Sequence, residues 1–266
     1  MAIKREPPVR KCARPITLVH EPKATKAILC LHGYSGYPGE LALPANRLFE
    51  AGFDVFVPRY PGHGTNGEDF LSTGAKEWIG MAESTLRELD GQYAQVSLVG
   101  HSMGGAIAVI LAKRYAIKSL VLYAPALLIP ALNHGLVSML SLFVKKRPRD
   151  WNRDPRYSFF DERDPDDDLY LGSQYWSWLY PRQLRQLSLI RREAEQALAE
   201  TTADILVLTG ENDTTVSQDV GILVIEKGLG NNNWVHMPKA THLIPYDIDT
   251  ATREEAMERT VSWLSL

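Results

Sequence analysis

Val-Ser-Leu-Val-Gly-His-Ser-Met-Gly-Gly, residues 96–105, is the most informative stretch of this sequence. A strand-like apolar run leads into the pattern Gly-x-Ser-x-Gly, and the apolar segment 106–112 that follows suits a buried helix. Where a strand turns sharply into a helix, a serine at the apex exposes its hydroxyl, and glycines on either side avoid collisions with neighbouring backbone. The context therefore predicts that Ser102 is a nucleophile. A glycine-rich turn without chemistry is the alternative.

The same alternation of strand-like and helical segments continues on both sides of this motif. Short apolar runs predict strands over residues 26–31, 54–58, 95–99, 119–123, 204–208 and 234–237. Helical periodicity predicts helices over residues 39–51, 75–89, 103–115, 218–227 and 252–264. Strands that alternate with helices indicate an α/β fold, with a mostly parallel central sheet and helices on both of its faces.

The alternation stops between residues 126 and 201, where the sequence contains no convincing strand. An apolar helical piece (127–144) is followed by a polar stretch (145–168), an aromatic cluster (170–180) and a helical segment (182–200). We expect this region to be a helical cap inserted over the sheet. The predicted organisation is thus a core formed by residues 1–125 and 202–266, with a cap formed by residues 126–201.

Two backbone N–H groups are candidates to stabilise the oxyanion that forms when a serine attacks a carbonyl. One belongs to Met103, directly after Ser102. The other belongs to Tyr34, because an apolar strand runs into the flexible turn His32-Gly33-Tyr34. A plain strand-ending turn is the alternative for this loop, in which His32 is expected to brace the backbone.

His242 is the expected general base, because it follows the last predicted strand and would lie over the strand ends near Ser102. The orienting acid is expected between the serine and the base along the chain. Asp213, just beyond the strand that ends near Gly210, would fix the tautomer of His242 and stabilise its protonated form. Glu211 is the competing acid. The alternatives are that Asp213 is an ordinary residue in the first turn of the following helix, and that His242 is a loop residue without a catalytic role.

The motifs, in their order, resemble the bacterial carboxylesterase and monoacylglycerol lipase group of α/β-hydrolases. They are the serine turn and four loops: Leu-His-Gly-Tyr-Ser-Gly (31–36), Tyr-Pro-Gly-His-Gly (60–64), Gly-Glu-Asn-Asp (210–213) and Ala-Thr-His (240–242). The resemblance covers about residues 25–125 and 203–265. It implies the α/β-hydrolase fold with an eight-stranded sheet, a triad at Ser102, Asp213 and His242, oxyanion donors at Tyr34 and Met103, and neither a metal nor an organic cofactor.

The expected activity is hydrolysis of short- to medium-chain acyl esters through an acyl-enzyme, with monoacylglycerols among the candidate substrates. It should fall below about pH 6–7, where histidine normally becomes protonated. A thioesterase, an amidase or an aminopeptidase would use the same triad, and a non-catalytic ligand-binding homologue is a further alternative. The candidate acyl-binding side chains are apolar residues of the cap, which could instead attach the cap to the core: Leu127, Ile129, Met139, Leu142 and Phe143.

The composition of the 266-residue chain is that of an ordinary soluble protein, with 45% hydrophobic and 23% charged residues. A net charge of −3 gives no electrostatic reason to expect nucleic-acid binding. The two cysteines, Cys12 and Cys30, form neither a metal-binding spacing nor a disulfide framework. With no secretory signal and no apolar run of about 18 residues, we expect a cytoplasmic protein without stable membrane insertion. The sequence leaves the oligomeric state open.

Overall fold

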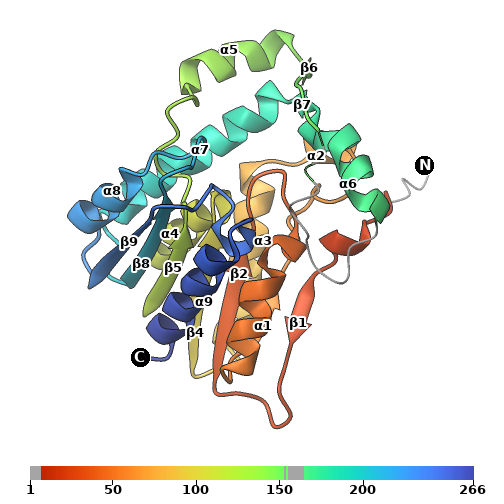
Figure 1. Ribbon diagram of the computed structural model, residues 1–266. Coiled ribbons are helices and arrows are strands. Elements are labelled where there is room, and N and C mark those ends of the chain that lie inside the picture. Colours follow the sequence, from red (N-terminus) through yellow and green to blue (C-terminus); the bar gives the residue numbers. More distant parts are fainter. Residues whose placement is uncertain (1–6, 153, 155–164) are drawn as a thin grey trace.

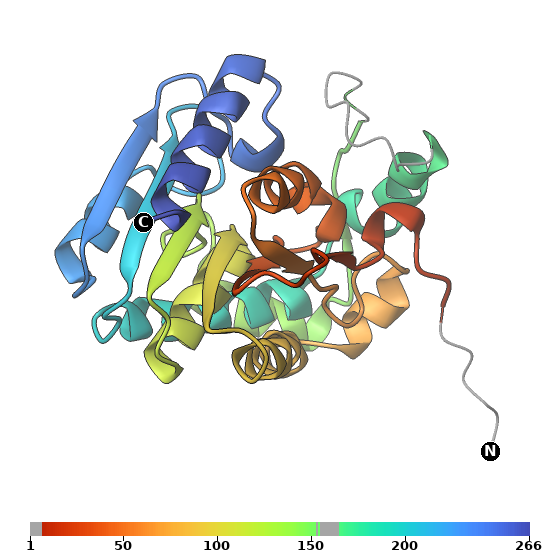
Figure 2. The same cartoon turned by 90° about the horizontal axis from the view of Figure 1, so that it is seen from below.

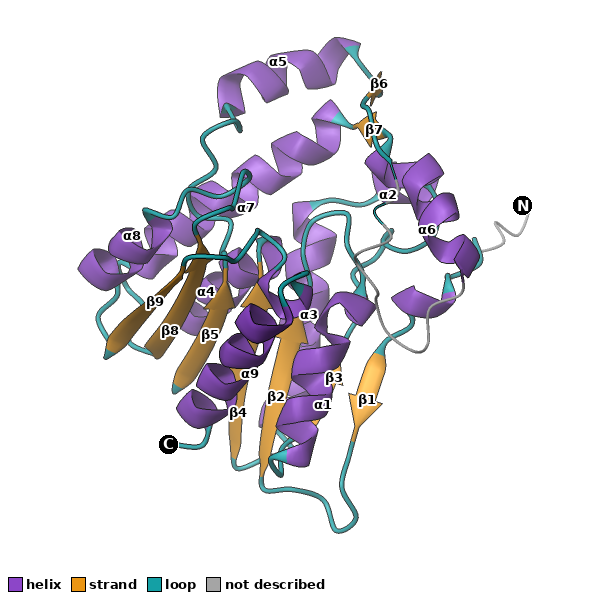
Figure 3. Cartoon of the chain, viewed as in Figure 1, coloured by secondary structure: helices purple, strands orange, loops and turns teal. Residues whose placement is uncertain are grey.

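The computed structural model describes residues 7–152, 154 and 165–266, so part of the polar stretch predicted over residues 145–168 lies outside it. The described chain forms a central sheet with the strand order β1-β3-β2-β4-β5-β8-β9 (Figures 1 and 3). Its strands are β1 (Ile16–Leu18), β2 (Lys26–Leu31), β3 (Asp54–Val57), β4 (Gln95–His101), β5 (Ser119–Tyr123), β8 (Asp204–Gly210) and β9 (Asn232–Met237). All neighbouring strands are parallel except β1, which runs antiparallel to β3. The predicted α/β fold with a mostly parallel sheet is confirmed.

The sheet has seven strands in the described part of the chain, so the eight strands implied by the family resemblance are wrong for this protein. Among the described residues before β2, the three-residue β1 is the only strand, and residues 19–25 between β1 and β2 form a loop.

Helices cover both faces of the sheet, as Figure 2 shows along the sheet from below. Adjacent residues of β4 point to opposite faces: Leu98 packs in the core beneath α3, α4, α7 and α8, whereas Val99 packs in the core beneath α1 and α9. Strands buried on both faces consist of continuous apolar runs, which explains the composition of β2, β4 and β5. The helices are α1 (Ala42–Glu50), α2 (Gly67–Ser72), α3 (Ala75–Asp90), α4 (Met103–Arg114), α5 (His134–Phe143), α6 (Pro165–Leu171), α7 (Pro181–Leu198), α8 (Val220–Lys227) and α9 (Thr250–Leu264).

The segment between β5 and β8 lies over the carboxyl ends of the strands (Figure 1). Its helix α7 packs against both α4 and α5, and thereby joins the segment to the core. A two-stranded antiparallel sheet of β6 (Arg147–Pro148) and β7 (Trp178–Leu179) also lies here, in a region where no strand was expected. We refer to residues 126–201 as the cap.

The apolar piece predicted to be helical over residues 127–144 is helical only in α5, from His134 onward. Asn133 sets this start, because its side chain accepts a hydrogen bond from the N–H of Leu136 at 3.0 Å. Such a bond satisfies one of the unpaired donors in the first turn of a helix. The residues before Asn133 therefore form a connection that descends toward the sheet.

Candidate active site

Ser102 lies at the apex of a sharp turn between β4 and α4. Its backbone has φ 53° and ψ −115°, a conformation that is strained for any residue other than glycine. The flanking glycines permit the turn: a Cβ atom on Gly104 would lie 1.9 Å from the carbonyl oxygen of Leu31, and one on Gly100 would lie 2.6 Å from the backbone of Gly104. The turn therefore has the geometry predicted from the spacing of its glycines.

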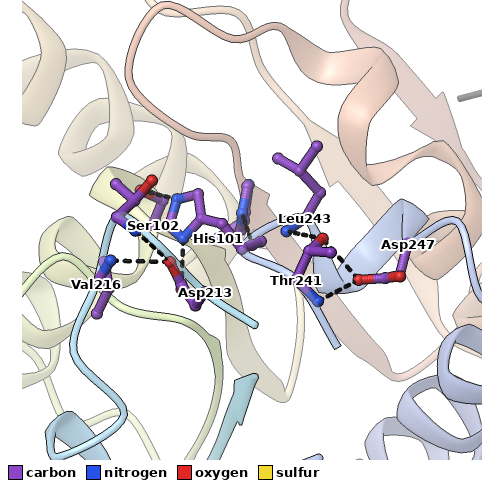
Figure 4. A network of polar contacts seen from close by, with 9 residues as sticks. His101, Ser102, Asp213, Val216, Thr241, Leu243 and Asp247 are labelled. Carbon is purple, nitrogen blue, oxygen red and sulfur yellow. Dashed lines mark hydrogen bonds and ion pairs between the residues drawn. The ribbon is translucent and has the colours of Figure 1, made fainter. Parts of the chain in front are cut away.

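The structure brings Ser102, Asp213 and His242 together at the carboxyl edge of the sheet, where Figure 4 labels Ser102 and Asp213. His242 Nδ1 lies 2.7 Å from Asp213 Oδ2, and its Nε2 lies 3.0 Å from Ser102 Oγ. Since a carboxylate only accepts, Nδ1 carries the hydrogen and Nε2 is free to accept the hydrogen of the serine hydroxyl. This chain of hydrogen bonds has the arrangement that a base-activated serine requires.

The environment of the site also prepares each group for this role. Burial lowers the pKa of His242 below its ordinary value of 6.5, against the opposing effect of the hydrogen bond to Asp213. Burial raises the pKa of Asp213, but the bond from His242 and the N–H groups of Val216 and Thr215 outweigh it and leave the pKa below its ordinary value. A neutral base beside an ionised acid is the state in which a serine can be deprotonated.

The loop that carries His242 is held by a second carboxylate, which sequence analysis did not identify. Asp247 is 1% exposed and accepts hydrogen bonds from the backbone N–H and the hydroxyl of Thr241, at 2.6 and 2.7 Å (Figure 4). The Thr241 hydroxyl oxygen in turn accepts from the N–H of Leu243 at 3.2 Å. The residues on both sides of His242 are therefore fixed. No local pattern in the sequence distinguishes Asp247 from an ordinary loop aspartate.

The predicted oxyanion donors border the same site. Among the described residues, the backbone N–H groups of Tyr34 and Met103 donate no hydrogen bond, so both are available to a ligand. His32 braces the loop as expected: its Nδ1 lies 3.0 Å from the carbonyl oxygen of Gly33, and its Nε2 accepts from the N–H of Tyr60 at 3.4 Å. Burial lowers the pKa of His32, which agrees with this bracing role for a neutral ring.

A pocket of about 490 Å³ opens beside Ser102 and His242, between the core and the cap. A larger hollow of about 810 Å³ lies between α2 and the end of α5, and none of Ser102, Asp213 and His242 lines it. The aromatic lining residues of the pocket beside Ser102 are Tyr34, Phe70, Tyr175, Trp176, Trp178 and Tyr180. Aliphatic side chains of the cap also line it, together with polar residues that include Arg149 and Thr214; the aliphatic residues include Ile129, Leu132, Val137, Leu179, Leu184 and Leu187.

Most of the predicted acyl-binding residues lie elsewhere. Of the five candidates, only Ile129 lines this pocket, and Leu127 is fully buried in the core. Met139, Leu142 and Phe143 are 54%, 76% and 82% exposed, whereas Val137 is the buried residue of α5. These three side chains do not line the pocket beside Ser102, whereas four rings of the aromatic cluster (170–180) do.

Comparison with known proteins identifies the family. The family model described as "Alpha/beta hydrolase family" matches residues 28–256, which is most of the chain. The chain belongs to the α/β hydrolase family. This α/β hydrolase is 32% identical over 110 residues to the thermostable monoacylglycerol lipase of Bacillus sp. (strain H-257), and 30% identical over 97 residues to the carboxylesterase of Bacillus subtilis (strain 168). These matches cover 41% and 36% of this chain, and only 44% and 39% of the two relatives.

Solved structures with the same fold match almost the whole hydrolase. One is a structure from work on the metagenome-derived lipolytic enzymes LipS and LipT, with a TM-score of 0.82, 20% identity, and coverage of 97% of this chain and 99% of the other. Another is the monoacylglycerol lipase of Paleococcus ferrophilus, with a TM-score of 0.71, 19% identity, and coverage of 94% and 97%. At these identities the likeness shows the fold alone.

The described part of this α/β hydrolase contains neither a cluster of metal-binding side chains nor a helix that could cross a membrane. In residues 7–152, 154 and 165–266, no three His, Cys, Asp or Glu side chains are placed to hold a metal ion together. Within the same part of the chain, no helix combines the length and the apolar character needed to cross a bilayer.

Proposed function

We propose that this α/β hydrolase is a serine carboxylic ester hydrolase that acts on short- to medium-chain acyl esters, including monoacylglycerols. The observation that carries the proposal is the hydrogen-bonded chain from Ser102 through His242 to Asp213, with spacings of 3.0 and 2.7 Å, at the wall of an apolar pocket. Because Asp213 occupies the acid position, we assign no role in catalysis to the exposed Glu211.

In the proposed reaction, Ser102 Oγ attacks the ester carbonyl carbon while His242 Nε2 takes its proton. The N–H groups of Tyr34 and Met103 stabilise the negative oxygen of the tetrahedral intermediate. The bond to the alcohol oxygen then breaks, and the alcohol leaves with the proton from His242. Water, deprotonated by the same histidine, attacks the acyl-enzyme and releases the acid, which restores the serine hydroxyl.

The pocket supports the proposed substrate class. Its apolar lining suits an acyl chain, and about 490 Å³ lies within the usual range for a site that encloses a small ligand. The names of the two Bacillus relatives, a monoacylglycerol lipase and a carboxylesterase, point to the same class of substrate.

The proposal is tested by hydrolysis of p-nitrophenyl esters from acetate to palmitate and of the corresponding monoacylglycerols, together with labelling by a fluorophosphonate probe. Ser102→Ala should abolish labelling and lower kcat by about 10⁶-fold. Parallel assays with acyl-CoA thioesters and aminoacyl anilides separate the thioesterase and the amidase or aminopeptidase alternatives. A wild-type protein that neither labels nor hydrolyses any of these substrates would favour a non-catalytic ligand-binding homologue.

A further inference from the structure

Two buried polar residues lie directly behind the proposed catalytic site, and the reaction proposed above does not use them. His101 precedes Ser102 at the end of β4 and is 2% exposed, while Glu40 lies in the short 3-10 helix η2 (Pro38–Leu41) and is 7% exposed. Glu40 Oε2 lies 3.6 Å from His101 Nδ1. Burial of a carboxyl and an imidazole is costly unless they interact with each other or with the backbone.

His101 holds the loop of the proposed base. Its Nε2 lies 2.9 Å from the carbonyl oxygen of His242, and because a carbonyl can only accept, Nε2 must carry a hydrogen. The imidazole of His242 thus bonds to Ser102, while the backbone of the same residue bonds to the neighbour of Ser102. The hydrogen bond from His101 to the His242 carbonyl therefore holds the turn that carries Ser102 close to the loop that carries His242. It does so independently of the hydrogen bonds among Ser102, His242 and Asp213.

Glu40 holds the loop of the proposed oxyanion donor. Its Oε2 accepts a hydrogen bond from the backbone N–H of Gly33 at 3.2 Å, and the next residue along the chain is Tyr34. The carboxylate fits closely beneath this loop, since a Cβ atom on Gly36 would lie 2.1 Å from Glu40 Oε1. Gly36 is therefore required for the close approach of the carboxylate.

The contact between the two side chains requires a proton. His101 Nδ1 is buried and has no hydrogen-bond partner among the described residues other than the facing carboxyl group, which lies just beyond hydrogen-bond distance. Two groups that both accept would repel each other at this separation. The pair then corresponds to an imidazolium that faces a carboxylate, with the hydrogen on His101 Nδ1.

We propose that Glu40 and His101 are positioning residues that share a buried proton and hold the oxyanion loop and the base loop in register with Ser102. This inference rests on the proposed ester hydrolysis. The pair of side chains connects the three segments that must be close together in the transition state: the oxyanion loop, the turn at Ser102 and the base loop. Misplacement of a reacting group by about 1 Å costs about 100-fold in rate.

The test compares matched variants in the full-length protein, with p-nitrophenyl butyrate as the substrate. Glu40→Gln keeps the shape, and its amide can accept from Gly33 and donate to a neutral His101, so kcat should stay within about threefold of wild type. Glu40→Ala removes both contacts and should lower kcat by about 10- to 100-fold, with KM within about twofold. His101→Gln, which retains a donor for the His242 carbonyl, should retain more activity than His101→Leu.

The pH profile of kcat/KM distinguishes the proposal from a purely structural role of Glu40 and His101, because a purely structural role would not change this profile. The charge of Glu40 raises the pKa of His242 and that of His101 lowers it, while Asp213 acts on His242 in all variants. Glu40→Gln should therefore move the acid limb of kcat/KM to lower pH, and His101→Gln should move it to higher pH. These opposite shifts remain measurable in the isosteric variants even if Glu40→Ala does not fold.

Each outcome decides the inference. Reduced kcat in Glu40→Ala, retention in Glu40→Gln and opposite pH shifts support it. An active wild type whose four variants keep its kcat and its pH profile would overturn the inference alone. Equal loss in Glu40→Gln and Glu40→Ala, or shifts of the same sign, would overturn it as well. A wild type that does not react with ester or fluorophosphonate overturns the proposed function, and the inference with it.

Discussion

The carboxyl edge of the sheet and the cap differ in how their side chains are held. At the sheet edge, buried polar groups are hydrogen-bonded: Asp213 accepts three hydrogen bonds, and Asp247 accepts two from Thr241 of the base loop. In the cap, α5 exposes Leu142 and Phe143 and buries only Val137. The sheet edge is thus a network of several buried polar contacts, whereas α5 buries Val137 and forms a hydrogen bond between His134 and Ser188 of α7 at 2.7 Å.

We expect the sheet edge to determine the rate of the reaction and the cap to determine which esters are accepted. Groups that act on charge need fixed positions, and a rigid sheet with short loops provides them. A pocket wall made of apolar side chains in the cap can change in shape while the network beneath it stays the same. Substitutions at the sheet edge should therefore affect all esters equally, and substitutions in the cap should affect some esters more than others.

The largest effect is expected from Asp213→Asn. The amide would favour the wrong tautomer of His242, and in comparable triads this change lowers kcat by about 10⁴-fold. The loss should be the same for every chain length in a p-nitrophenyl ester series. Glu211→Gln is the matched control, since Glu211 is exposed and lies only two residues away. A comparable loss in the control would move the acid role to Glu211.

A smaller and selective effect is expected from Leu184→Trp in α7. Leu184 lines the pocket, so the larger ring should occupy space that a long acyl chain needs. We expect kcat/KM to fall about tenfold or more for the longest accepted ester and to change little for acetate. Leu142→Ser, on the outward face of α5, serves as the control and should leave the chain-length profile unchanged. Uniform loss in Leu184→Trp would contradict the separation of chemistry from selectivity.

The sequence predicted the sheet edge well because its signals are local. The glycines around Ser102 are required by backbone contacts that any such turn makes, and Asp213 and His242 each follow directly on a strand. Parallel strands bring their carboxyl ends to one edge, so residues in such loops converge. Glu40 and Asp247 escaped notice because each acts through a partner that only the folded chain reveals.

The cap was predicted less well, because which of its side chains face the pocket depends on how its helices pack. Val137 and Leu142 are both apolar and lie in the same helix, so the sequence cannot tell which of them turns inward. The contact between α5 and α7 decides this, and it places Leu142 outside the pocket.

The pH dependence is a more modest effect of the sheet edge. Because burial lowers the pKa of His242 below 6.5, the base stays neutral to a lower pH than a free histidine would. The kcat/KM profile should therefore be half-maximal below pH 6.5 and decline as the pH falls further, when the imidazole takes up a proton. A midpoint at or above pH 6.5, measured with an uncharged ester, would contradict a desolvated base.

The smallest effect concerns stability and compares one pair of substitutions in the two regions. At Ser102 the positive φ strains alanine but not glycine, so Ser102→Gly should be more stable than Ser102→Ala by about 1 kcal/mol, after the greater backbone entropy of glycine is subtracted. At Ser141, inside the ordinary helix α5, the order should reverse, because glycine costs about 1 kcal/mol relative to alanine there.

Thermal denaturation of the four variants measures both differences. For a chain of this size, 1 kcal/mol corresponds to about 2–4 °C in Tm. If glycine is more stable than alanine at Ser102 but less stable at Ser141, the backbone is strained at the sheet edge and not in the cap. Such strain is expected where a serine is held in a reactive orientation. If alanine is more stable than glycine at both positions, the backbone at Ser102 adapts to alanine without a cost in free energy. The backbone at Ser102 would then not be strained.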